Sequence, residues 1–102
     1  MNPVVEEHRT ELEALCRRYR VRRLDLFGSA AFGRDQSGKS DLDILVEFEP
    51  LPAGAYADTY FGLLEDLERL FGRPVDLVVA SAIKNPYVRD SVERTRVSLY
   101  AT

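Results

Sequence analysis

The feature that most constrains the fold is a segment of strict alternation between residues 41 and 48. Every second residue of it is apolar, namely Leu42, Ile44, Val46 and Phe48. The residues between them are Asp41, Asp43, Leu45 and Glu47. Because successive side chains of a β-strand point to opposite faces, this pattern predicts a strand with one apolar face. Its other face carries the carboxylates of Asp41 and Asp43, with Glu47 further along the strand.

Further strands are predicted on both sides of this segment. In residues 21–27, two leucines alternate with Arg23 and Asp25, which is typical of a strand with one buried face. Residues 74–80 are apolar and largely β-branched except for Asp76, which predicts a third strand. A short edge strand is expected at residues 97–100.

Helical spacing predicts three helices. The first covers residues 3–18, with Asn2 as its cap. The second is marked by apolar residues between positions 60 and 71 and ends at Gly72. The third covers about residues 87–93.

Between the first two strands, Ser29 is expected to cap a short helical segment at residues 30–32. Gly33 ends this segment, and residues 34–40 are polar and form a loop. The element order predicts an α+β (mixed α/β) fold, a small mixed β-sheet with helices packed on one face. At 102 residues the chain fits a single domain, residues 1–102.

Composition and charge exclude several classes of protein. The formal charge is -3, and no long basic block is present, so direct nucleic-acid binding is not expected. The basic stretch at residues 17–23 is interpreted as a solvated face at a helix end. No apolar stretch approaches the length of a membrane span, and the first residues do not resemble a signal peptide. A single cysteine, Cys16, indicates a reducing cytoplasm.

Three carboxylates are the candidate catalytic and metal-binding residues. Asp41 and Asp43 are two residues apart on one strand, so their Cα atoms are roughly 6.5 Å apart and both side chains share a face. Such a pair repels unless a cation intervenes, and hard oxygen ligands suit Mg²⁺. Asp76 is the only charged residue of an apolar strand, where a bare carboxylate is costly to bury. If the two strands are adjacent with matching pleat, the three carboxylates converge and suit a two-metal phosphoryl transfer.

A binding site for a triphosphate is predicted at Gly28 and Ser29, where a strand ends and a helix begins. Arg34 and Lys39, in the following loop, are within reach of a phosphate. Taken alone, a Gly-Ser pair is more often only a turn with a cap, and an Asp-x-Asp strand is a solvated face in about half of cases. The ordered combination with Asp76 favours an enzyme.

The segment LFGSAAFGRDQSGKSDLDILVEF resembles the signature of the DNA polymerase β-like nucleotidyltransferase superfamily, and PVDLV resembles its third-carboxylate strand. Within that superfamily, the length and the whole pattern resemble the minimal nucleotidyltransferase (MNT) domains encoded beside HEPN partners. Such pairs act as toxin-antitoxin modules.

The resemblance implies a role for each matching residue. Gly28 and Ser29 would hold the nucleoside triphosphate, Asp41 and Asp43 would bind two Mg²⁺ ions, and Asp76 would complete the site and help to deprotonate the acceptor. The implied reaction transfers AMP from ATP to a tyrosine of a HEPN ribonuclease toxin encoded nearby, which makes this chain the antitoxin.

The sequence also departs from the family pattern. Ala30 and Phe32 stand where many members carry arginine, and Arg34 is the residue that would compensate. Two other functions therefore stay open, a non-catalytic antitoxin that acts by binding and a nucleotidyltransferase that modifies a small molecule or an RNA end. No acceptor-binding domain is expected within these residues, so a partner in a homo- or hetero-oligomer would supply the acceptor.

Overall fold

The computed structural model describes residues 7–28 and 41–102. Within these residues the strands form one sheet in the order β3-β2-β1-β4. The strands are β1 (Val21–Phe27), β2 (Leu42–Phe48), β3 (Val75–Val79) and β4 (Val97–Ala101). Strand β1 is antiparallel to both β2 and β4, whereas β2 and β3 are parallel. The predicted α+β class with a small mixed sheet is confirmed.

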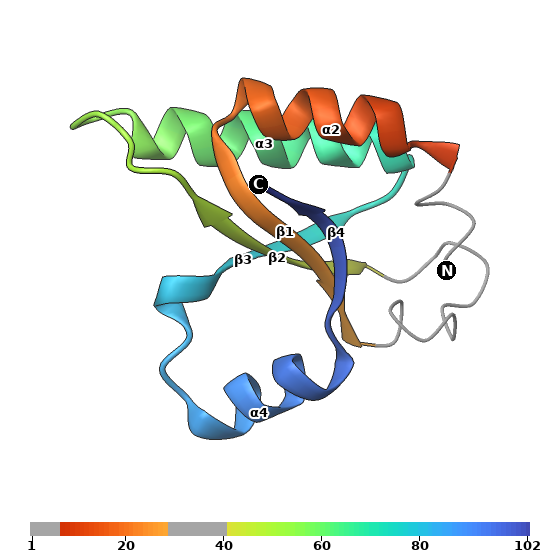
Figure 1. Cartoon of the computed structure of the whole chain (residues 1–102), viewed down its shortest axis with the longest axis vertical. Coiled ribbons are helices and arrows are strands. Elements are labelled where there is room, and N and C mark those ends of the chain that lie inside the picture. Colours follow the sequence, from red (N-terminus) through yellow and green to blue (C-terminus); the bar gives the residue numbers. More distant parts are fainter. Residues whose placement is uncertain (1–6, 29–40) are drawn as a thin grey trace.

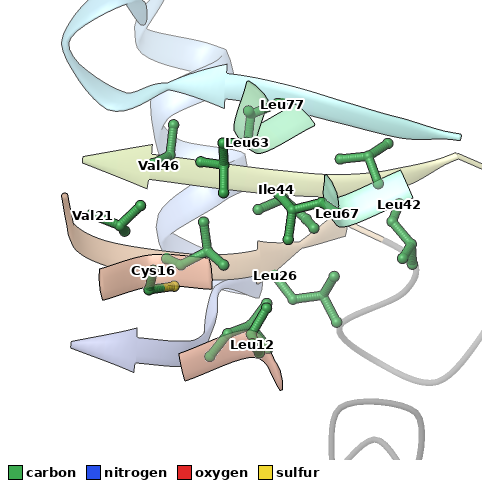
Figure 2. Close-up of a cluster of buried hydrophobic side chains, with 13 residues drawn as sticks. Leu12, Cys16, Val21, Leu26, Leu42, Ile44, Val46, Leu63, Leu67 and Leu77 are labelled. Atoms are coloured by element: carbon green, nitrogen blue, oxygen red, sulfur yellow. The ribbon is translucent and has the colours of Figure 1, made fainter. Parts of the chain in front are cut away.

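Two helices, α2 (Arg9–Arg18) and α3 (Tyr56–Phe71), lie side by side over one face of the sheet (Figure 1). Their apolar stripes meet the alternate residues Leu42, Ile44 and Val46 of β2, which are all buried. Leu12 and Cys16 of α2 and Leu63 and Leu67 of α3 complete the centre of this core (Figure 2). The apolar face predicted for residues 41–48 therefore packs against α2 and α3 in the main core.

The ends of two helices follow local rules that the sequence already shows. Gly72 ends α3 in the left-handed conformation, with φ of +68°. Asn85 caps α4 (Pro86–Thr95), because its side-chain oxygen accepts hydrogen bonds from the backbone N–H groups of Tyr87 and Val88. Helix α4 is thus slightly longer than the predicted range of 87–93.

Helix α4 lies on the opposite face of the sheet from α2 and α3 (Figure 1). Val92 of α4 packs with Ile83 and with Leu45 of β2, in a second and smaller apolar cluster. The prediction that helices pack on one face holds for α2 and α3 but not for α4. The physical reason is Leu45, an apolar side chain on the face that also carries Asp43.

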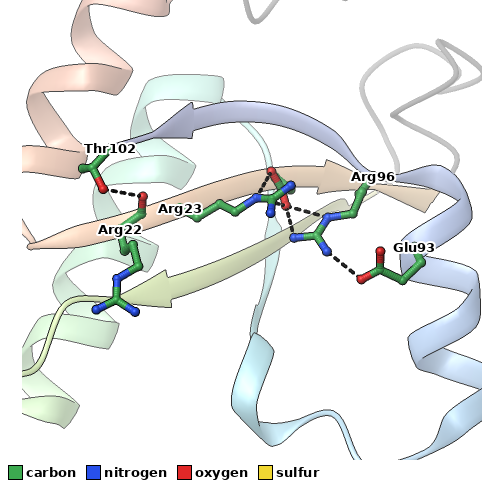
Figure 3. A network of polar contacts seen from close by, with 6 residues as sticks. Arg22, Arg23, Glu93, Arg96 and Thr102 are labelled. Carbon is green, nitrogen blue, oxygen red and sulfur yellow. Dashed lines mark hydrogen bonds and ion pairs between the residues drawn. The ribbon is translucent and has the colours of Figure 1, made fainter.

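Asp25 of β1 is fully buried, so the prediction of one buried face for residues 21–27 is wrong. Its carboxylate is paired with Arg96, at the end of α4, and with Arg23, whose Nε lies 3.0 Å from Oδ2 (Figure 3). A buried charge is tolerated only where it is paired in this way. Both faces of this central strand are therefore covered.

Strand β3 is the outermost strand on its side of the sheet, within the part of the chain that the structure describes. Two side chains of α3 bind its outward backbone groups. The hydroxyl of Tyr60 donates to the carbonyl of Leu77 at 2.5 Å, and the N–H of Val75 donates to Oε2 of Glu68 at 3.0 Å. An edge blocked in this way is less available to a foreign strand.

Some predicted elements fall outside the described residues. The predicted start of the first helix with its Asn2 cap, the segment at 30–32 and the loop at 34–40 are among them. Helix α2 begins at Arg9 and ends at Arg18. Its last residue is the one predicted for the end of the first helix. Across residues 7–28 and 41–102, no helix is both long enough and apolar enough to cross a membrane.

Candidate active site

Asp43 and Asp76 are direct partners in the parallel ladder of β2 and β3. Neighbouring strands lie about 4.8 Å apart, and paired residues of parallel strands point to the same face. The two carboxylates therefore share one face at one end of the sheet. The adjacency of these two strands was a condition of the prediction, and the structure meets it. The roles of the residues stay a prediction.

Asp41 precedes β2 by one residue and is exposed. The backbone N–H of Leu42 donates to the carbonyl of Pro74 at 3.0 Å, which joins the starts of β2 and β3. The pKa of Asp43 is raised above its ordinary value, first by burial and then by the negative charges of Asp76 and Asp41. The three carboxylates thus lie within electrostatic reach of one another.

Gly28 approaches the same carboxylates from β1. Because β1 is antiparallel to β2, its last residue, Phe27, is the partner of Asp43. Gly28 follows with φ of +71°, and a Cβ built on it would lie 2.6 Å from Oδ2 of Asp43. Real Cβ contacts are essentially never this short, so a side chain at position 28 would force the Asp43 carboxylate to move.

The backbone N–H of Gly28 donates to Oγ1 of Thr95 at 3.0 Å. This N–H was expected to be one of the donors to a phosphate, and in this conformation it is already bonded. The feature of Gly28 that the geometry uses is the missing side chain beside Asp43. Thr95 itself was not among the predicted residues, and nothing in its local sequence indicates this contact.

The carboxylates of Asp41, Asp43 and Asp76 offer oxygen donors to a metal ion. Within the described residues, no three acidic, histidine or cysteine side chains are grouped as a ready-made metal site. The donors at this end of the sheet are carboxylate oxygens, the type that Mg²⁺ prefers, and Mg²⁺ is usually held by one or two carboxylates together with water and substrate phosphates. Asp43 is only half-buried, and both Asp41 and Asp76 are exposed, so a solvated ion can reach these oxygens. The residues present therefore fit a magnesium ion that is shared with a nucleotide.

Other predicted site residues are placed differently. Ser29, Arg34 and Lys39 lie outside the described residues. Glu47, on the same face of β2 as Asp43, is half-buried further along the strand. The described part of the candidate site consists of Gly28, Asp41, Asp43 and Asp76.

The described fold is a mixed sheet in which two aspartates are paired near the starts of neighbouring strands, with a glycine beside one of them. The model of the nucleotidyltransferase domain family matches residues 8–99. This chain belongs to that family.

Two curated relatives extend over most of the chain. The Methanocaldococcus jannaschii protein MJ1379, whose name assigns it provisionally to the protein adenylyltransferases, is 38% identical over 93 residues, 91% of each chain. The protein adenylyltransferase MntA of Thermococcus cleftensis is 38% identical over 82 residues, which is 80% of this chain and 76% of MntA.

Solved structures share the fold. One, described provisionally as a minimal nucleotidyltransferase, aligns with a TM-score of 0.73 and 34% identity, over 90% of this chain and 89% of that chain. A chain of a toxin-antitoxin complex with AMP-PNP aligns with a TM-score of 0.69 and 22% identity, over 92% of this chain and 73% of that chain. A chain of the complex of tri-AMPylated Shewanella oneidensis HEPN toxin with MNT antitoxin aligns with a TM-score of 0.64 and 19% identity, over 96% of this chain and 73% of that chain. The last two likenesses concern the fold alone.

Proposed function

We propose that this nucleotidyltransferase uses Mg²⁺ to transfer AMP from ATP to a tyrosine hydroxyl of a HEPN-type ribonuclease toxin, and so acts as its antitoxin. The observation that carries the proposal is the pairing of Asp43 with Asp76 beside Asp41, at one end of a nucleotidyltransferase sheet. The choice of AMP and of a protein acceptor is supported by MntA, which is named as a protein adenylyltransferase.

The choice of partner is supported by the solved complexes. Chains with this fold occur in toxin-antitoxin complexes, and in one of them the toxin is an AMPylated HEPN protein. A protein partner also supplies what the fold lacks, since no second domain that could bind an acceptor is present among the described residues. We place the reaction in the cytoplasm, where a lone buried thiol such as Cys16 stays reduced.

The reaction is an in-line displacement at the α-phosphorus of ATP. The tyrosine oxygen forms a new bond to that phosphorus, the bond to the β-phosphate bridging oxygen breaks, and pyrophosphate leaves with the electron pair. The phenolic proton passes to a base. When bound, Mg²⁺ supplies charge neutralisation and polarises the phosphate oxygens.

The residues of the chain have distinct roles in this reaction. Asp41 and Asp43 would hold Mg²⁺, and Gly28, which packs closely against Oδ2 of Asp43, would set the position of that carboxylate. Asp76 is exposed and faces the same side, which supports our proposal that it receives the phenolic proton. Ser29 and Arg34 are proposed to hold the triphosphate.

The product explains how the toxin would be inhibited. An AMP group adds bulk and negative charge to a tyrosine of the ribonuclease. Because the RNA substrate is itself a polyanion, a new negative charge near the toxin's active site would repel it. Transfer of AMP would therefore block RNA cleavage without covering the whole toxin.

The test is a transfer assay with labelled ATP, Mg²⁺ and the HEPN protein encoded beside this chain. The wild type is expected to label the toxin, and a chelator is expected to stop the labelling. Asp43→Asn keeps the shape of the side chain and removes its charge, so we expect a loss of about a hundredfold or more. Asp58→Asn, at an exposed position in the first turn of α3, is the matched control and should label the toxin normally.

Two results would contradict the proposal. Undiminished labelling by Asp43→Asn would remove the carboxylates from the mechanism. Neutralisation of the toxin by an Asp43→Asn variant that no longer labels it would instead favour an antitoxin that acts by binding.

A further inference from the structure

The C-terminal end of α4 is bonded to β1 at two points. Thr95, the last residue of the helix, contacts Gly28, and the next residue, Arg96, contacts Asp25. The two anchor points, Asp25 in β1 and Gly28 directly after it, lie on either side of Phe27, the partner of Asp43. The end of α4 thus holds the segment of β1 that leads into the candidate active site.

Thr95 uses its hydroxyl group in two directions. The hydroxyl donates to the carbonyl of Ser91 at 2.9 Å, one turn earlier in α4, and it accepts the N–H of Gly28 at 3.0 Å. Its donor capacity is therefore used within the helix, and its acceptor capacity holds the Gly28 peptide. A backbone N–H that is partly buried needs such an acceptor.

Arg96 makes the second link rigid. Its Nε donates to Oδ2 of Asp25 at 2.8 Å, its Nη2 donates to the same oxygen, and its Nη1 donates to Oε1 of Glu93 at 2.7 Å (Figure 3). Asp25 is fully buried, whereas Arg96 is 17% exposed. This ion pair fixes where α4 ends relative to β1, and so it fixes the position of the Thr95 hydroxyl.

The contacts form a continuous path from α4 to a carboxylate. Oγ1 of Thr95 holds the Gly28 peptide, and Gly28 approaches Asp43 so closely that no Cβ fits between them. If the hydroxyl is removed, the N–H of Gly28 must turn toward water to find an acceptor. That turn moves Gly28 relative to Asp43.

We propose that Thr95 is a positioning residue for nucleotidyl transfer, because its hydroxyl holds Gly28 against the Asp43 carboxylate. The inference rests on the proposed transfer of AMP. Thr95 touches neither nucleotide nor acceptor in this role and acts only through the Gly28 peptide.

The experiment compares Thr95→Val, which keeps the shape and removes the hydroxyl, with Thr95→Ser, which keeps the hydroxyl. Thr59→Val is the matched control, since Thr59 makes the same bond to a carbonyl one turn earlier, Ala55 at 2.8 Å, but lies in α3. We expect Thr95→Val to lose about tenfold in kcat/KM, the effect of one lost hydrogen bond, while Thr95→Ser and Thr59→Val stay near wild type.

Two readouts separate positioning from stability. A variant that is only less stable has less active enzyme, so its apparent kcat falls and its KM for ATP is unchanged. Thr95→Val should instead raise the KM for ATP and leave the KM for the toxin unchanged. By NMR, the amide hydrogen of Gly28 should exchange faster in Thr95→Val than in Thr59→Val, with or without Mg²⁺.

The outcomes are distinguishable. An active wild type together with a Thr95→Val variant of equal kcat/KM and equal Gly28 exchange would overturn the positioning role and leave the proposed function standing. A folded wild type that labels nothing would overturn the proposed function itself. If Thr95→Val does not fold, Thr95→Ala provides the same comparison, and wild-type kcat/KM in that variant would overturn the positioning role.

Discussion

Gly28 and Asp43 are so close that a Cβ on residue 28 would lie 2.6 Å from Oδ2 of the carboxylate. The contact joins the end of β1 to the start of β2, and it involves the most buried of the three carboxylates of the candidate site. The position of a candidate metal ligand therefore depends on the absence of a side chain on the neighbouring strand.

Gly28→Ala should inactivate the enzyme without unfolding it. The new methyl group must push Asp43 away, and a displacement of about 1 Å at a catalytic site can cost about a hundredfold in rate. The left-handed backbone adds a penalty of about 1–2 kcal/mol in the free energy of unfolding. Labelling of the toxin and the thermal midpoint are the two measurements.

Gly72→Ala is the control for this prediction. Gly72 has nearly the same φ, +68° against +71°, but a Cβ there would meet nothing within 4 Å. The two variants should therefore lose similar stability, and only Gly28→Ala should lose activity. Equal activity in both would show that the contact with Asp43 is unimportant.

Arg96→Ala should be strongly destabilising. It removes the main partner of the buried Asp25, and breaking a buried ion pair costs about 3–5 kcal/mol. Because Arg23 still faces Asp25, we expect the free energy of unfolding, measured in urea, to fall by the lower end of this range, about 3 kcal/mol. Arg94→Ala breaks the exposed pair with Asp90 and should cost below about 0.5 kcal/mol. Similar losses in the two variants would contradict the buried-pair interpretation.

Cys16 should be inert in the folded protein. Burial, with a smaller effect from Glu13, raises the pKa of its thiol from 9.0 to about 12. Alkylation of the native protein should therefore be far slower than alkylation in concentrated urea, by mass spectrometry. Because the folded state favours the neutral thiol, its contribution to stability is complete below pH 9.0 and is lost as the pH rises toward 12. Cys16→Ala should show a weaker dependence of stability on pH in this window.

Much of the site could be predicted because it depends on local patterns. Alternation in residues 41–48 placed Asp41 and Asp43 on one face, and the isolated charge of Asp76 marked its strand. Their convergence needed the parallel pairing of β2 and β3, which a helix between two strands favours but does not prove. The register that pairs Asp43 with Asp76 became visible only in the structure.

The side of the sheet occupied by α4 was predicted wrongly, because it depends on contacts distant in sequence. Asp25 looked like an outward polar residue of an alternating strand, and its partner Arg96 lies 71 positions away. Leu45, an apolar residue on the carboxylate face, was the one available signal that this face is partly covered. Thr95 gave no signal, since a threonine near a helix end usually needs no distant partner.

Strand β3 has a ladder partner on one side only, within the described chain, and α3 supplies the remaining bonds to its outward edge through Tyr60 and Glu68. Outer strands held in this way open locally at a lower free energy than the strands at the centre of a sheet. The proton acceptor proposed for the reaction, Asp76, lies on this outer strand. On heating, catalysis would therefore cease while most of the molecule is still native, so the fraying of one strand sets the working temperature limit of the enzyme.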